Sequence, residues 1–295
     1  NTISSTQCYG IIVGGQFNTI DGTGCSNTIG GGGTNNCIHI SNGCDKNTIS
    51  GGGGNCILCN NENATVGGGA SNIICRTSGT DYGSTIAGGA GNCLVTATCW
   101  SFIGGGRYNC STSNRTVIGG GEANTGSGCF SVIGGGNCNT AGGIGSSVLG
   151  GVRNSALGNC SVVVGGANNL ASGLFSYAGG EGSLADAAQS FAHGYFVTAS
   201  GGAAAAFGAL TQADGYNAFA VGTQNLASNT DSVAFGYQTC AVASQSMATG
   251  YQTCAAGASS LAGGGVSCAI GGNSIAWGTA NCACGFNSFA LGCTN

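Results

Sequence analysis

Proline is absent from the 295 residues of this chain, and charged residues make up only 5% of it. The absence of proline and of a Gly-X-Y period excludes a collagen triple helix. Disordered chains are usually charged and rich in proline, so this composition also argues against disorder. Because only five Lys and Arg residues are present, no basic patch can form, and we expect no nucleic-acid partner.

Long apolar runs are missing as well. No run approaches the ~20 residues that a membrane helix needs, so we expect no membrane insertion. No signal peptide is visible at the first residue, Asn1. A chain that begins in this way is expected to be either processed or part of something longer.

Glycine, in contrast, is abundant, with 62 residues, and it recurs at a fixed period. The stretch "SVAFGYQTCAVASQ" (232–245) is followed at once by "SMATGYQTCAAGAS" (246–259). From Gly180 to Gly292, the glycine of a Ser-x-Ala-x-Gly unit returns every 14 residues. Toward the N-terminus the spacing varies from 14 to 20, and the unit becomes "SVIGGGN" or "NTIGGGG". We therefore divide the chain into an irregular glycine-rich part, residues 1–175, and a strictly periodic part, residues 176–295.

The repeat length selects the fold class. Fourteen residues are too few for two helices and a turn, and glycine costs ~1 kcal/mol in a helix interior. A register that survives while one loop lengthens is typical of stacked coils. The sequence thus predicts an all-β protein, a parallel β-solenoid in which each repeat is one coil with two short strands and two turns.

Positions within the repeat, counted from its serine, predict the interior. Side chains alternate along a strand, so positions three and five should share one face, and positions ten and twelve another. These positions are almost entirely Ala and Gly, and only such small side chains fit where the two strands of a flattened coil face each other. The predicted interior contains the position-three alanines Ala178, Ala192, Ala206, Ala220, Ala234, Ala248, Ala262, Ala276 and Ala290.

Positions two and four should then point outward, and there the residues are large. Stacked in register, they form a continuous apolar stripe, and each side chain is worth roughly 1.5–3 kcal/mol if buried. A monomer rarely leaves so large a patch exposed, so the stripe predicts self-association. The predicted interface contains Tyr177, Phe191, Phe207, Phe219, Val233, Phe235, Met247, Leu261, Ile275, Trp277, Phe289 and Leu291.

The Ser-x-Ala-x-Gly repeats of residues 176–295 resemble the heads of trimeric autotransporter adhesins. The resemblance implies a left-handed β-roll of about 14 residues per coil, with three chains side by side as a homotrimer. The "SVIGGGN" part, residues 9–175, is similar to glycine-rich repeats in fibre and spike proteins of large viruses and phages. Together they imply an extracellular fibre or adhesin module on a cell or virion surface, which contacts host receptors or glycans. Adhesin heads are normally poor in cysteine, whereas this chain contains 19.

Four of the cysteines occupy position nine: Cys240, Cys254, Cys268 and Cys282. Neighbouring coils are ~4.8 Å apart, within the ~4.4–6.8 Å Cα window of a disulfide, so a disulfide ladder is predicted. Disulfides would place the protein outside a reducing cytosol. The cysteine spacing does not match a zinc site, and His39 and His193 are the only histidines, so we expect neither metal nor cofactor. The candidate glycosylation sites are Asn63, Asn109, Asn114 and Asn159.

Catalytic chemistry finds no support in the sequence. Nine carboxylates and two histidines are scattered along the chain, and no two acids recur at a spacing that faces one cleft, so we expect no enzyme. The alternative function is an ice- or surface-binding β-solenoid. Threonines do recur shortly before the repeat glycines of the N-terminal part, at Thr28, Thr48, Thr65, Thr85 and Thr116, but a Thr-x-Thr face is missing.

The ends of the chain lead to one more expectation. Isolated solenoids carry caps, whereas this chain begins on "NTISSTQCYG" and stops part-way through a coil at "SFALGCTN". Either it is part of a longer fibre, or rods stack head to tail into a filament. In the stacked arrangement, Cys8 and Cys293 would lie near the junction.

Overall fold

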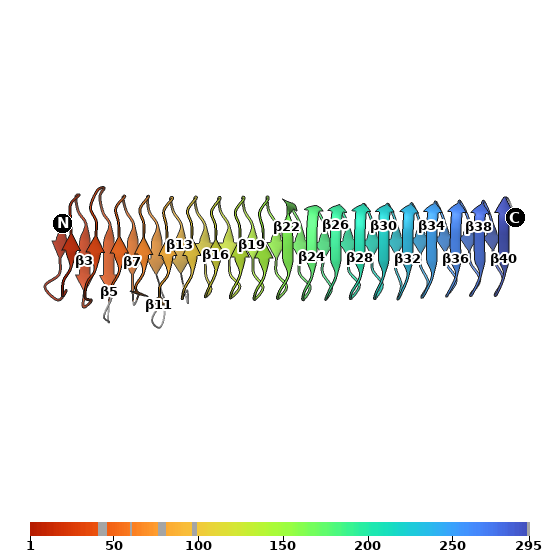
Figure 1. Ribbon diagram of the computed structural model, residues 1–295, viewed down its shortest axis with the longest axis horizontal. Helices are drawn as coiled ribbons and strands as arrows, with labels where there is room; N and C mark the ends of the chain where they lie inside the picture. The colour runs from red at the N-terminus through yellow and green to blue at the C-terminus, as the bar shows by residue number, and fades with distance from the viewer. Residues whose placement is uncertain (41–45, 60, 76–80, 96–98, 294–295) are drawn as a thin grey trace. The chain divides into compact units, whose positions relative to one another are not determined.

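The computed structural model describes residues 1–40, 46–59, 61–75, 81–95 and 99–293. These residues form two compact units, Asn1–Ala156 and Leu157–Asn295. Each unit is a parallel β-solenoid built from strands and turns, and the prediction of an all-β solenoid is confirmed (Figure 1). The change of repeat type at residues 175/176 lies inside the second unit. No described segment forms a helix that could cross a membrane.

Two sheets line the coils of the first unit, and we name each after its first strand. The β1 sheet contains β1 (Thr2–Ile3), β3 (Thr19–Gly22), β5 (Cys37–Ile40), β7 (Cys56–Leu58), β10 (Ile73–Cys75), β13 (Cys93–Val95), β15 (Cys110–Ser111), β17 (Thr125–Gly126), β19 (Thr140–Ala141) and β21 (Ser155–Ala156). The β2 sheet contains β2 (Ile11–Ile12), β4 (Thr28–Ile29), β6 (Thr48–Ile49), β9 (Thr65–Val66), β12 (Thr85–Ile86), β14 (Phe102–Ile103), β16 (Val117–Ile118), β18 (Val132–Ile133) and β20 (Ser147–Val148). A separate pair consists of β8 (Asn61–Glu62) and β11 (Asp81–Tyr82).

The second unit also has two sheets, with longer strands in one than in the other. The β22 sheet contains β22 (Val162–Ala167), β24 (Tyr177–Glu181), β26 (Phe191–Tyr195), β28 (Ala205–Ala209), β30 (Phe219–Thr223), β32 (Val233–Tyr237), β34 (Met247–Tyr251), β36 (Leu261–Gly265), β38 (Ile275–Thr279) and β40 (Phe289–Cys293). The β23 sheet contains β23 (Leu170–Ala171), β25 (Leu184–Ala185), β27 (Thr198–Ala199), β29 (Gln212–Ala213), β31 (Leu226–Ala227), β33 (Cys240–Ala241), β35 (Cys254–Ala255), β37 (Cys268–Ala269) and β39 (Cys282–Ala283).

The strand register of the second unit follows the sequence repeat residue for residue. Val233 lies beside Met247, Gly236 beside Gly250, and all neighbouring strands of the β22 sheet are parallel. Parallel in-register stacking places each repeat position in a column along the solenoid. Consequently, the side chains at one position form one surface or one layer of the interior.

The interior of the second unit is made of the smallest side chains. The structure buries all nine position-three alanines, from Ala178 at 0% to Ala290 at 9% exposure. Position-ten alanines such as Ala241 face them from the β23 sheet and are also buried. In the first unit the same role belongs to larger residues, including Ile29, Ile49 and Ile103. We did not anticipate this isoleucine interior from the sequence, because the alanine pattern is confined to the later repeats.

Position five corrects our assignment of the interior. Its glycines are half-buried or exposed, and they have positive φ, for example +133° at Gly236. A Cβ at Gly236 would clash with the carbonyl oxygen of Gly250 in the next coil. The backbone therefore leaves the straight strand here, and simple alternation fails. Position twelve lies at a turn and is likewise mixed, buried at Gly201 but exposed at Asn229.

Buried asparagines form a polar layer of the interior that our sequence analysis did not predict. In the first unit, an asparagine precedes most strands of the β1 sheet, and each side-chain oxygen accepts the backbone N–H of the asparagine one coil later. Asn124 illustrates the pattern: its Oδ1 accepts from Asn139 N at 3.0 Å, and its Nδ2 donates to the carbonyls of Gly120 and Gly136 at 2.9 and 3.0 Å. The members of this asparagine ladder are Asn18, Asn36, Asn55, Asn72, Asn92, Asn109, Asn124, Asn139 and Asn154.

Candidate functional site

The outer stripe is the surface made by the position-two and position-four side chains on the β22 sheet. The strands from β24 to β40 bury the alanine at repeat position three, so the side chains at positions two and four, on either side of it, face outward. The large side chains at these positions are half-buried or exposed in the single chain, with Phe219 at 40%, Phe235 at 51% and Phe289 at 68%. Neither position carries an Asp, Glu, Lys or Arg in any repeat. The stripe is thus an uncharged apolar surface that follows the strand columns.

Aromatic rings stack along the first part of the outer stripe. The ring centroids of Tyr177 and Phe191 lie 4.1 Å apart with planes 8° from parallel. Phe191 and Phe207 follow at 4.9 Å, and Phe207 and Phe219 at 6.1 Å. Such pairs contribute ~0.5–1.5 kcal/mol beyond the area that they bury. The rings hold one another in place, so this surface is preorganised for packing against a flat partner.

Small residues in the stripe are covered by large neighbours. A Cβ at Gly263 would clash with the indole ring of Trp277, which reaches across from the next coil. In the same way, a Cβ at Gly179 would lie 2.6 Å from Nδ1 of His193. A glycine in one coil therefore accommodates a bulky side chain of the next.

A column of tyrosines runs beside the outer stripe at position six, and our sequence analysis did not single it out. Tyr195, Tyr237 and Tyr251 are exposed, and the rings of Tyr237 and Tyr251 stack at 5.4 Å. The "GYQTC" segment, which occurs at 236–240 and again at 250–254, was the available signal. Tyrosine combines apolar area with a hydroxyl that can pair with a polar partner.

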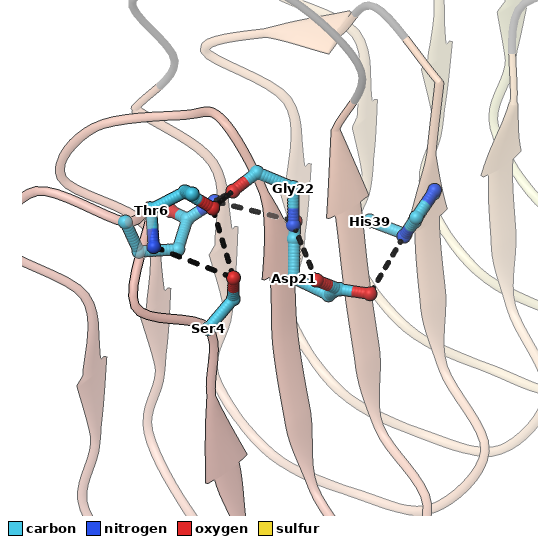
Figure 2. Close-up of polar contacts among 6 residues, drawn as sticks. Ser4, Thr6, Asp21, Gly22 and His39 are labelled. Atoms are coloured by element: carbon cyan, nitrogen blue, oxygen red, sulfur yellow. Dashed lines mark hydrogen bonds and ion pairs between the residues drawn. The ribbon is translucent and has the colours of Figure 1, made fainter.

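The first unit contains one cluster of polar side chains that joins neighbouring coils (Figure 2). His39 Nδ1 lies 3.4 Å from Asp21 Oδ2, and both side chains are about half exposed. Asp21 Oδ1 accepts the N–H of Gly22 at 2.7 Å, while Thr6 Oγ1 donates to the Gly22 carbonyl at 2.5 Å. The His39–Asp21 and Thr6–Gly22 contacts link adjacent turns, so the cluster ties coils together. Among the described residues, no three His, Cys, Asp or Glu side chains come close enough to hold a metal ion.

The position-nine cysteines stack as the repeat predicts. Cys240 lies beside Cys254, Cys254 beside Cys268, and Cys268 beside Cys282 on the β23 sheet. All four are thiols in the structure. The neighbouring Cys254 thiol lowers the pKa of Cys240 to about 7, because its hydrogen bond stabilises the thiolate. The disulfide ladder remains a prediction, for which the register provides the necessary proximity.

The four candidate glycosylation sites differ in their surroundings. Asn63 and Asn159 are exposed and Asn114 is half-buried. Asn109 is fully buried in the asparagine ladder, and its Nδ2 donates to the carbonyls of Gly105 and Gly121, both at 2.9 Å. An amide nitrogen enclosed in this way leaves no room for a glycan, so we no longer regard Asn109 as a candidate.

Threonines form a short column in the first unit. Thr28, Thr48, Thr65 and Thr85 pair in register on the β2 sheet and are half-buried. Thr116 does not belong to this column, because its side chain is fully buried. The column is one residue wide and passes into Phe102 and Val117. An ice-binding surface needs a broader regular array, so this arrangement does not favour the alternative function.

Comparisons with known proteins support the sequence resemblance over part of the second unit. Residues 199–225, 213–239 and 227–253 each match the family model described as "YadA head domain repeat (2 copies)". Residues 199–253 thus carry repeats of the type found in trimeric autotransporter adhesin heads, which confirms the resemblance for this segment. No curated protein matches the chain.

Proposed function

We propose that this chain is a non-enzymatic structural module of an extracellular fibre or adhesin, assembled as a side-by-side homotrimer through the outer stripe. The uncharged, stacked apolar surface of the β22 sheet is the observation that carries the proposal. A second copy of the chain is the occupant that fits best. Its own columns repeat at the same spacing, so apolar side chains on the partner meet apolar side chains along the full stripe.

The family match supports the same assembly. Heads with YadA-type repeats form trimers and are displayed on cell surfaces, and residues 199–253 carry such repeats. By extension, we propose the left-handed β-roll geometry of these heads for the second unit. We also propose that the module faces the outside of a cell or virion and contacts host receptors or glycans. A trimer presents three copies of every exposed column, so weak contacts add up through avidity.

Glycan binding provides a test of this function. The labelled wild-type protein should bind at least one class of glycan on an array of immobilised N- and O-linked structures. Phe219→Asp with Phe235→Asp, which removes two anchors of the outer stripe, should weaken the apparent affinity by ~10²–10⁴-fold through loss of multivalency. Denatured wild-type protein is the control for nonspecific adsorption. Binding of equal strength by the wild type and the double variant would contradict a trimeric adhesin.

A further inference from the structure

Several cysteines of the first unit lie in pairs across neighbouring coils. On the β1 sheet, Cys37 lies directly beside Cys56, and Cys93 beside Cys110. A third pair lies at the strand ends: the Sγ of Cys59, just after β7, is 3.4 Å from the Sγ of Cys75, the last residue of β10. In-register neighbours on parallel strands have Cα atoms ~4.8 Å apart, within the window that a disulfide spans. No large backbone movement is therefore needed to join either β1-sheet pair.

The order of residues in the β1-sheet column makes the pairing specific. Going from β3 to β17, the column reads Thr19, Cys37, Cys56, Ile73, Cys93, Cys110 and Thr125. Ile73 separates the two pairs, and threonine bounds them at either end. Each of these cysteines therefore has a single cysteine neighbour in the column.

The pairs occur in the part of the first unit where the coils are long, although the longest coil, with 20 residues from Asn72 to Asn92, lies between the two column pairs. Successive members of the asparagine ladder are 19 residues apart from Asn36 to Asn55, and 17 apart from Asn92 to Asn109. Beyond Asn109 the spacing settles at 15, as between Asn109 and Asn124. Longer turns cost more conformational entropy to order, and a covalent link across the base of a turn removes part of that cost. A disulfide at each thiol pair would therefore close a coil that is longer than the 15-residue coils beyond Asn109.

We propose that Cys37–Cys56, Cys59–Cys75 and Cys93–Cys110 are three sites of oxidative modification, each closing into a disulfide that staples one coil to the next. The oxidant that we name is a small-molecule disulfide of the glutathione type. This inference concerns the first unit and does not depend on trimer formation.

The surroundings of the β1-sheet cysteine pairs favour thiol–disulfide exchange, in which one cysteine attacks the small disulfide and its neighbour then closes the bond. A hydrogen bond from the Cys37 thiol lowers the pKa of Cys56 to about 7, and the same contact together with burial raises the pKa of Cys37. The Cys93 thiol likewise lowers the pKa of Cys110. Burial, together with a contact to Cys59, raises the pKa of Cys75 to about 11. In the two β1-sheet pairs, one cysteine is thus a thiolate-prone nucleophile, and its neighbour remains a thiol ready for the second step.

Oxidation of the Cys37–Cys56 pair takes two successive thiol–disulfide exchange steps. The Cys56 thiolate attacks one sulfur of the small disulfide, so a mixed disulfide forms, the original S–S bond breaks, and one thiolate leaves. The Cys37 thiol then loses its proton and attacks the Cys56 sulfur. A Cys37–Cys56 bond forms and the second small thiol leaves. The pair is oxidised by two electrons, and the small disulfide is reduced to two thiols.

Oxidation of the full chain with oxidised glutathione tests this inference. The protein is fully reduced, freed of reductant and incubated at pH 7 without oxygen. It is then alkylated, digested with pepsin and mapped by mass spectrometry. We expect linked peptides for all three pairs, each lacking two hydrogens, before any linkage accumulates between cysteines that are not neighbours in adjacent coils. The oxidised chain should also unfold at a higher urea concentration than the reduced chain.

Two exposed cysteines serve as internal controls. Cys138 and Cys160 occupy turn positions with φ near +55°, and the described part of the chain places no cysteine beside them in the strand register. They should collect glutathione as a mixed disulfide. Cys56→Ser should abolish the first linkage and leave the Cys93–Cys110 linkage intact, while Cys138→Ser should change none of the three.

Three results would overturn the inference. The first is glutathione adducts on the paired cysteines at the same frequency as on Cys138, with no linkage. The second is a set of linkages between cysteines that are not neighbours. The third is protection of the pairs from alkylation by added Cu⁺ alone, with no linkage on oxidation, which would identify a soft-metal site instead.

Discussion

Asn124→Ala should lower the free energy of unfolding by about 2–4 kcal/mol, because it removes one rung of the asparagine ladder. The substitution leaves the buried N–H of Asn139 without its acceptor and deprives the carbonyls of Gly120 and Gly136 of a donor. Each buried polar group without a partner costs about 1–3 kcal/mol. The loss should appear as a lower urea midpoint, with circular dichroism as the readout.

Asn137→Ala is the matched control for this prediction. Asn137 belongs to the same coils, and its backbone bridges Glu122 and Val152, but its side chain is only half-buried. Its replacement should change stability by less than about 0.5 kcal/mol, as surface substitutions usually do. Equal midpoints for the two variants would show that the ladder contributes nothing beyond its backbone hydrogen bonds.

Phe219→Asp combined with Phe235→Asp should convert the proposed trimer into single chains, or cause aggregation if the chain is unstable alone. Each phenylalanine loses roughly 1.5–3 kcal/mol of burial, and six of them are removed per trimer. The introduced carboxylates would also be buried without partners in the interface, which adds a further penalty. Size-exclusion chromatography with light scattering measures the change in mass, and circular dichroism reports whether the strands persist.

Substitutions on the opposite sheet provide the control. Leu226 lies on β31, and Ile270 follows β37 with 49% of its surface exposed. Leu226→Asp with Ile270→Asp introduces the same number of charges on the β23 side of the coil and should preserve the oligomer. If both double variants dissociate equally, the charge itself is responsible and the outer stripe is not the interface.

Most of the fold of the second unit could be predicted from the sequence repeat alone. A strict period of 14 with Ala at positions three and ten leaves little choice, because only parallel in-register coils bring like positions together. The same period placed the apolar residues on the outside. The family match at residues 199–253 falls within the part of the chain where this pattern is strictest.

Two features of the interior escaped the sequence analysis for physical reasons. Alternation assumes a straight strand, whereas the backbone turns at Gly236 and its equivalents, where φ is positive. Hydropathy gives no reason to bury asparagine, since the benefit arises only when the next coil supplies the N–H group that it accepts. The recurrence of Asn directly before the strands of the β1 sheet, as at Asn55 after "GGGG" (51–54), was nevertheless a usable signal.

In the outer stripe, too, some features could be predicted from the sequence and others could not. The outward direction of the Phe219 and Phe235 columns could be predicted, because it depends only on the neighbouring position-three alanine being buried in the interior. The covering of Gly263 by Trp277 could not, because it depends on how far a side chain reaches between coils. The tyrosine column at position six was hidden by the same bend at position five that defeated simple alternation.

Sedimentation equilibrium of the wild-type protein tests the central claim most directly. The account predicts a species of three times the 28.2 kDa of one chain, and the same mass should persist under reducing conditions, since apolar burial holds the chains together. A folded species of 28.2 kDa at every concentration tested would contradict the account, because the outer stripe would then be exposed to water without a partner.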